Sequence, residues 1–152
     1  MHNATIRHKI LTIPGLHNSG PTHWQTLWEH KFADCERVDL GRWAEPDKDA
    51  WTRRIADAIE AESEPVLIAA HSLGCHAFAH WFAAASAVTR TRIAGALLVA
   101  PPDLSNLRHE HRVTGFDDTP GFTSRTPMIV VASDNDNYAK TAYAWRQSRK
   151  WD

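Results

Sequence analysis

The chain has few cysteines and no excess of either charge, and each of these features excludes some classes of protein. Its 152 residues include only two cysteines, Cys35 and Cys75, which lie too far apart for a Cys-x-x-Cys motif. Neither sign of charge is in excess, since 17 lysines and arginines stand against 18 aspartates and glutamates, a net charge of -1. A nucleic-acid partner or an anionic membrane surface therefore has no electrostatic support.

Long hydrophobic runs are also missing. The longest apolar stretch, residues 77–88, contains His80 and is shorter than the roughly 20 residues that span a bilayer. The first residues lack the charged-then-apolar plan of a secretory signal peptide. We therefore expect a soluble protein of the reducing cytoplasm that has no membrane partner.

The sequence does contain a regular alternation of strand and helix patterns. This order predicts one α/β domain over residues 1–152, a three-layer α/β/α sandwich around a mostly parallel sheet. Thr22 and Gln25 have the spacing of a capping box, which predicts a helix that starts there with Trp24, Leu27 and Trp28 on one face. Residues 101–126 show no period and predict a long loop. We expect strands near residues 9–13, 36–40, 65–70, 93–100 and 128–132, and further helices near residues 49–62, 75–88 and 139–150.

The segment AHSLG, residues 70–74, lies between an apolar strand pattern and an apolar helix pattern. It matches the Gly-x-Ser-x-Gly nucleophile elbow, with alanine in the first glycine position. In that motif a tight turn exposes the serine oxygen at the carboxyl end of the sheet. We therefore predict that Ser72 is a nucleophile rather than a plain turn residue, and that the N–H of Leu73 faces a developing oxyanion.

A glycine-rich loop, GLHNSGPT at residues 15–22, differs by one letter from a phosphate-binding loop. Pro21 occupies the lysine position and supplies neither a charge nor an N–H, which argues against a nucleotide site. A hydrolase instead needs a second oxyanion donor from the loop after an early strand. The N–H of Leu16 or of His17 fits this role, and Leu16 is our first choice.

Four segments together resemble a known family: PGLHNSGPTHWQTLWE, AHSLGCHA, LVAPPD and SDNDNYA. They are similar to the small serine-hydrolase family of the α/β-hydrolase superfamily that includes the retinoblastoma-binding serine hydrolase. The resemblance implies a Ser–Asp–His triad and carboxylesterase-type hydrolysis of small ester or acyl substrates, with no cofactor. By position in these segments, Ser72 matches the nucleophile and Asp136 the acid, while Asp103 is the rival acid. Substrate contacts are expected from His17, Asn18, Ser19 and Trp24.

The histidine of the triad has no match. Triad residues of α/β-hydrolases follow the chain order Ser, Asp, His, and no histidine follows Asp136. The favoured interpretation is a C-terminally truncated form of a longer chain, which would be nearly inactive. The other interpretation is a natural form that has lost catalysis or that borrows another histidine as its base, for which the sequence offers His17, His71, His109 and His111.

Two further alternatives bear on function. His76 and His80 have helical spacing suited to a metal, but the glutamate of a His-Glu-x-x-His site is absent, so we expect no metal. A non-catalytic module that binds a protein partner on the same fold is the other alternative, because a fold does not fix a function. Labelling of Ser72 by a serine-reactive probe separates a hydrolase from such a module.

Overall fold

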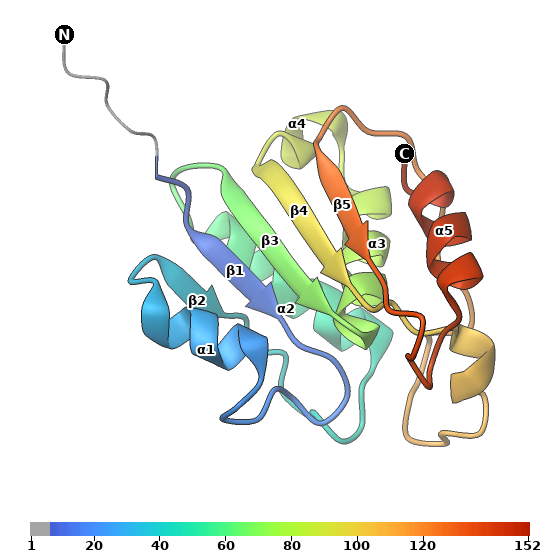
Figure 1. Ribbon diagram of the computed structural model, residues 1–152. Helices are drawn as coiled ribbons and strands as arrows, with labels where there is room; N and C mark the ends of the chain where they lie inside the picture. The colour runs from blue at the N-terminus through green and yellow to red at the C-terminus, as the bar shows by residue number, and fades with distance from the viewer. Residues whose placement is uncertain (1–6) are drawn as a thin grey trace, which may run out of the picture.

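A single sheet of five parallel strands, in the order β2-β1-β3-β4-β5, organises the chain (Figure 1). The computed structural model describes residues 7–152, so residues 1–6, on which the signal-peptide expectation largely rests, lie outside the described residues. All strands run in the same direction, so their carboxyl ends meet at one edge. The strands are β1 (Ile10–Ile13), β2 (Cys35–Arg37), β3 (Val66–His71), β4 (Ile93–Val99) and β5 (Met128–Val131).

Helices cover both faces of this sheet, as the predicted three-layer sandwich requires. In Figure 1, α2 and α3 lie behind the strands, whereas α1 lies at the β2 edge and α5 beside β5. The helices are α1 (Trp24–Lys31), α2 (Lys48–Glu60), α3 (Leu73–Ala84), the short α4 (Ala87–Arg90) and α5 (Thr141–Lys150). No helix within residues 7–152 is long and apolar enough to cross a membrane.

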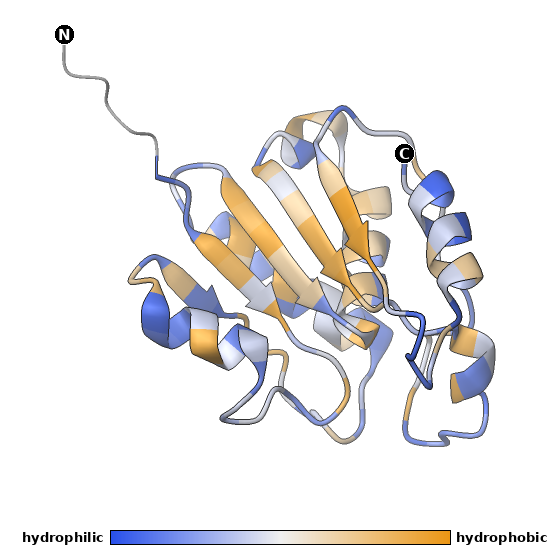
Figure 2. Cartoon of the chain, in the orientation of Figure 1, coloured by the Kyte–Doolittle hydropathy of each residue, from blue (hydrophilic) through white to orange (hydrophobic). Residues whose placement is uncertain are grey.

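The core forms where hydrophobic residues recur at the period of each element. In α2, Trp51, Ile55 and Ile59 are spaced by four residues and therefore lie on one face of the helix, and all three are buried. Almost the whole of α3 is buried, including Phe78 and Phe82, which explains its uniformly apolar sequence. Figure 2 shows the same distribution, with hydrophobic residues in the central strands and hydrophilic ones concentrated on α1 and α5.

The start of α1 differs from the predicted capping box. The N-cap residue is His23, whose Nδ1 accepts a hydrogen bond from the N–H of Gln25, while Thr22 is exposed. The predicted apolar face is also wrong, because Leu27 is 53% exposed and the helix buries Gln25 and Thr26 instead. A polar network beneath the helix, described below, takes the place of apolar packing.

The helix predicted over residues 75–88 is two helices. It begins earlier, at Leu73, and ends at Ala84, where Ala85 turns to an extended conformation. Ser86 then caps α4 by accepting a hydrogen bond from the N–H of Thr89, a local bond that competes with continuing the first helix. Elsewhere, β2 ends at Arg37 rather than extending to Leu40, and the long loop contains one 3₁₀ turn, η1 (Leu104–Leu107).

Candidate active site

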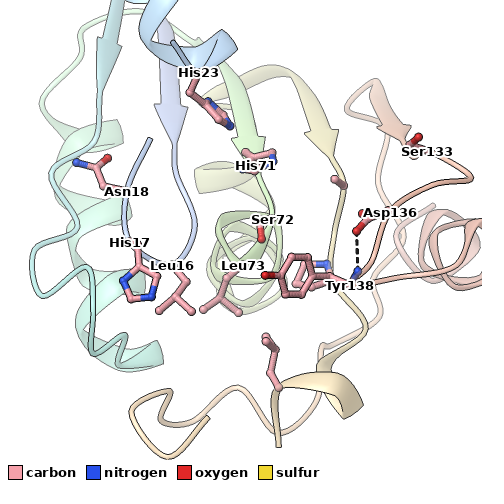
Figure 3. Close-up of a pocket in the computed structure, with 13 residues that line it drawn as sticks. Leu16, His17, Asn18, His23, His71, Ser72, Leu73, Ser133, Asp136 and Tyr138 are labelled. Atoms are coloured by element: carbon pink, nitrogen blue, oxygen red, sulfur yellow. Dashed lines mark hydrogen bonds between the residues drawn. The ribbon is translucent and has the colours of Figure 1, made fainter. Parts of the chain in front are cut away.

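A cavity of about 470 Å³ opens at the carboxyl edge of the sheet (Figure 3). Segments that follow β1, β3, β4 and β5 all reach it, because parallel strands bring their carboxyl ends to the same edge. The structure therefore gathers residues that are more than 100 positions apart in the chain. The lining residues are Leu16, His17, Asn18, His23, His71, Ser72, Leu73, Ala100, Pro102, Leu107, Ser133, Asp136 and Tyr138.

Ser72 occupies the turn between β3 and α3 with φ 53° and ψ -129°. A non-glycine residue in such a region costs on the order of 1–3 kcal/mol and persists only where its surroundings hold it. Here the N–H of Ser72 donates to the carbonyl of Val99 at 2.9 Å, and its own carbonyl accepts from the N–H of Cys75 at 2.9 Å. The result is the strained strand-to-helix turn that a nucleophile elbow requires.

Two glycines let the loop after β1 approach this turn. A Cβ on Gly74 would lie 2.4 Å from the carbonyl oxygens of both Ile13 and Pro14, and one on Gly15 would lie 2.9 Å from the Cβ of Ser72. These separations are shorter than ordinary van der Waals contact, so neither position accepts a side chain without movement. The loop at residues 15–20 thus lies directly against the nucleophile turn.

The backbone hydrogen bonds around this loop show which backbone donors are free near Ser72. The N–H of His17 donates to the carbonyl of Trp43 at 2.8 Å and is therefore occupied. Among residues 7–152, the N–H groups of Leu16 and Leu73 have no hydrogen-bond acceptor. Leu73 is the first residue of α3, where N–H groups lack partners within the helix and the helix dipole favours negative charge.

The two candidate acids have different surroundings. Asp136 lines the cavity from the segment between β5 and α5, and its Oδ1 accepts from the N–H of Tyr138 at 2.7 Å (Figure 3). Asp103 does not line the cavity. Its Oδ1 accepts from the N–H and the hydroxyl of Ser105 at 3.0 and 2.7 Å, which caps η1.

Three imidazoles line the cavity, and their environments differ. The ring of His71 lies edge-on to that of His23 with centroids 4.5 Å apart. Burial lowers the pKa of His71 to about 4, with His23 acting in the same direction and Asp136 against it. Burial also lowers the pKa of His23, so both rings are neutral at pH 7. His17 is exposed, and no imidazole in residues 7–152 hydrogen-bonds to Ser72 or Asp136.

Two of the expected substrate residues lie outside the cavity lining. Ser19 is buried and donates its hydroxyl to Oε1 of Gln25 at 2.6 Å, which is a loop-anchoring contact. Trp24 packs edge-on against Trp28 and has a buried Nε1 without an acceptor among the described residues. The substrate contacts expected of these two residues stay a prediction. The positions of both residues depend on which face of α1 is turned toward the sheet. The sequence pattern predicted a different face as the buried one.

Sequence reasoning missed Tyr138 and His23 as residues of this cavity. Tyr138 is two residues after Asp136 and is 62% exposed, so its ring stands at the rim. Its place in the SDNDNYA segment was the available signal. His23 follows the glycine-rich loop, and its sequence context indicates only a surface residue before a helix. The structure shows that it is the N-cap of α1.

The histidine pair on α3 does not resemble a metal site. Nε2 of His76 donates to the carbonyl of Pro102 at 2.8 Å, and Nε2 of His80 donates to the carbonyl of Asp118 at 2.8 Å. In the part of the chain that the structure describes, no group of three His, Cys, Asp or Glu side chains is arranged to hold a metal ion. His76 instead helps to place Pro102, a cavity residue.

Comparisons with known proteins agree with this arrangement. Residues 10–152 match the family model described as serine hydrolase. A crystal structure described as a YdeN-like hydrolase from Pectobacterium atrosepticum is 26% identical with a TM-score of 0.78, covering 95% of this chain and 73% of that one. The ydeN gene product from B. subtilis is 19% identical with a TM-score of 0.71, covering 95% and 81% of the two chains.

A third structure supports the fold alone. A protein from Xanthomonas campestris pv. campestris, described as a hydrolase of the alpha/beta superfamily, is 21% identical with a TM-score of 0.61, and 95% of this chain and 83% of that chain are covered. No curated protein matches the sequence. The family match spans the whole sheet and the elbow that carries Ser72, and the chain therefore belongs to the serine hydrolase family, with the α/β-hydrolase fold.

Proposed function

We propose that this protein hydrolyses small, uncharged carboxylic esters or related acyl compounds, with Ser72 as the nucleophile. One observation carries the proposal: a serine in a strained elbow lines the same cavity as Leu16 and Leu73, whose backbone N–H groups have no acceptor among residues 7–152. Donors aimed at the position where negative charge develops supply a large share of the catalysis in acyl transfer.

In the proposed mechanism, the hydroxyl oxygen of Ser72 attacks the carbonyl carbon while a base takes the hydroxyl proton. The carbonyl electron pair moves to the oxygen, which then accepts hydrogen bonds from the N–H groups of Leu16 and Leu73. Collapse of this intermediate expels the alcohol, which receives the proton from the base. Water then repeats the same steps on the acyl-enzyme and releases the carboxylic acid.

We assign Asp136 as the acid that orients the base, because it lines the cavity whereas Asp103 caps η1. The base itself is an imidazole other than the three in the cavity wall. Nδ1 of His23 is engaged by the N–H of Gln25, and the low pKa of His71 makes that ring a weak base. His17 belongs to the loop that presents Leu16, opposite the segment of Asp136 (Figure 3).

The cavity favours a neutral acyl group. Its volume of about 470 Å³ lies within the range for small-molecule sites, and leucine and proline side chains form much of its wall. Within residues 7–152, no lysine or arginine lines it, and the only carboxylate in its lining is that of Asp136. An anionic substrate would therefore meet a negative charge without a compensating cation. Both cysteines are free and buried, which accords with the cytoplasmic location that we propose.

Reaction with a fluorophosphonate probe, read by intact mass and peptide mapping, tests this proposal. We expect one probe per chain on the peptide that contains Ser72, and none on the Ser72→Ala variant. The matched control is Ser133→Ala, which removes another serine of the same cavity and should leave labelling intact. Equal labelling of the wild type and Ser72→Ala, or none of either, would overturn the hydrolase proposal and favour a protein-binding module.

A further inference from the structure

Arg37, the last residue of β2, uses all five of its N–H donors. Two of them, on Nε and Nη2, pair with the carboxylate oxygens of Glu29 at 2.9 and 2.8 Å. The second proton of Nη2 goes to the hydroxyl of Thr26 at 2.6 Å. Both protons of Nη1 go to the loop after β1, to Oδ1 of Asn18 and to the carbonyl oxygen of Ser19, each at 3.0 Å.

The loop that receives these bonds is strained. His17 and Asn18 both have φ 65°, in the left-handed region that non-glycine residues rarely adopt. Two such residues in succession persist only where neighbouring groups hold them. Oδ1 of Asn18 also accepts from the N–H of Ser19 at 2.8 Å. The guanidinium therefore binds the loop at Asn18, one of its two residues with left-handed backbone. Leu16, which lines the cavity, directly precedes this pair.

Glu29, the partner of Arg37, is itself held by a residue of the sheet. Glu29 accepts from the hydroxyl of Thr12 in β1 at 2.5 Å, and the Arg37 and Glu29 side chains are only 21% and 16% exposed. Gln25 adds a second contact, since its amide donates to the carbonyls of Ile13, the last residue of β1, and of Ala69 in β3. The loop is therefore fixed relative to the strand that leads into Ser72.

We propose that Arg37 is a positioning residue for the hydrolysis: it holds the loop so that the N–H of Leu16 stays aimed at the developing oxyanion. The inference rests on the proposed function, because it assigns Arg37 a purpose within that reaction. Arg37 does not line the cavity and so touches no substrate. A misplacement of about 1 Å at a catalytic group lowers a rate by up to about 100-fold, which sets the size of the effect.

The test measures the fluorophosphonate reaction as a saturable process in wild type, Arg37→Lys and Glu29→Gln. Lysine keeps the charge but cannot form the five-bond fork, so we expect kinact to fall about 10- to 100-fold while KI stays within about twofold. Glu29→Gln keeps the shape of its side chain and should lower kinact in the same direction by a smaller factor. The matched control is Arg42→Lys at an exposed Arg42–Glu45 pair of 2.9 Å, which should react at the wild-type rate.

The possible outcomes distinguish a failure of the Arg37 role from a failure of the proposed hydrolase function. No reaction of the wild-type serine overturns the proposed function, whereas full reactivity of the wild type and both variants overturns only the role of Arg37. A rise in KI with unchanged kinact also contradicts it, because that pattern indicates a disturbed pocket rather than a displaced oxyanion donor. If Arg37→Lys does not fold by circular dichroism, Glu29→Gln decides: unchanged kinact in that variant refutes the proposal.

Discussion

Gly74 lies so close to the end of β1 that a Cβ at this position would stand 2.4 Å from the carbonyl oxygen of Ile13. The contact joins α3, the helix that follows Ser72, to β1, the strand that precedes the loop at residues 15–20. It involves backbone on both sides, so no flexible side chain can yield. The second small residue of the elbow motif is therefore required by the packing of this chain itself.

Replacing Gly74 with alanine should damage stability and probe reactivity together. We expect a loss of about 1–3 kcal/mol in the free energy of unfolding, as for other overpacked sites, measured by urea denaturation. Gly20→Ala is the matched control, since nothing lies within 4 Å of its Cβ position. An unchanged urea midpoint for Gly74→Ala would contradict the close approach.

The acid assignment predicts opposite outcomes for two aspartates. In a catalytically competent form of the protein, Asp136→Asn should lower ester turnover by up to about four orders of magnitude, because an amide holds the imidazole in the wrong tautomer. Asp103→Asn should change turnover by only a few-fold, since Asp103 caps η1 and does not line the cavity. Turnover of p-nitrophenyl acetate measures both, and the reverse ranking would make Asp103 the acid.

The three imidazoles in the cavity wall should each prove dispensable as the base. We expect His17→Ala, His71→Asn and His23→Asn to retain fluorophosphonate reactivity within about tenfold; asparagine at residue 23 keeps an N-cap acceptor for α1. Loss of a triad base costs several orders of magnitude. A loss of that size in one variant, with circular dichroism unchanged, would identify that residue as a borrowed base.

His76 should make the stability of the protein depend on pH. Burial lowers its pKa to about 4, with His80 and Lys150 acting in the same direction and the Pro102 carbonyl and Asp103 against it. In the unfolded chain the imidazole of His76 therefore binds a proton near pH 6.5, whereas in the folded chain it binds one only near pH 4. The stabilisation is complete above pH 6.5 and is lost as the pH falls toward 4.

The variant His76→Gln isolates that contribution. Its amide retains a donor for Pro102 but does not titrate, so the fall in Tm between pH 7 and pH 5 should be smaller than in the wild type. His71 has a similarly low pKa and will keep part of the dependence in the variant. Identical Tm changes in both proteins would show that His76 makes no contribution over this range.

How far the sequence predicted the site differs from one element to the next. The elbow around Ser72 was recognisable because the strand, the turn and the helix are consecutive in the chain. The loop of Leu16 was predicted from the need for a second donor after an early strand, and Asp136 from the family resemblance; the cavity includes both residues. The position of Ser19 and Trp24 outside the cavity lining could not be predicted, because the face that α1 presents to the sheet depends on buried polar contacts that have no hydrophobic period.

The sequence by itself determined the alternation of strands and helices, the parallel sheet and the elbow, because hydrophobic periodicity and backbone turns act over a few neighbouring residues. Only the tertiary structure decided which donors beside Ser72 are free, since the N–H of His17 is taken by Trp43, 26 residues further along the chain. It likewise decided that the side chains of Arg37 and Gln25 hydrogen-bond to the loop at residues 15–20 instead of pointing into solvent. Hydrogen bonds between segments distant in sequence require geometry that no local pattern encodes.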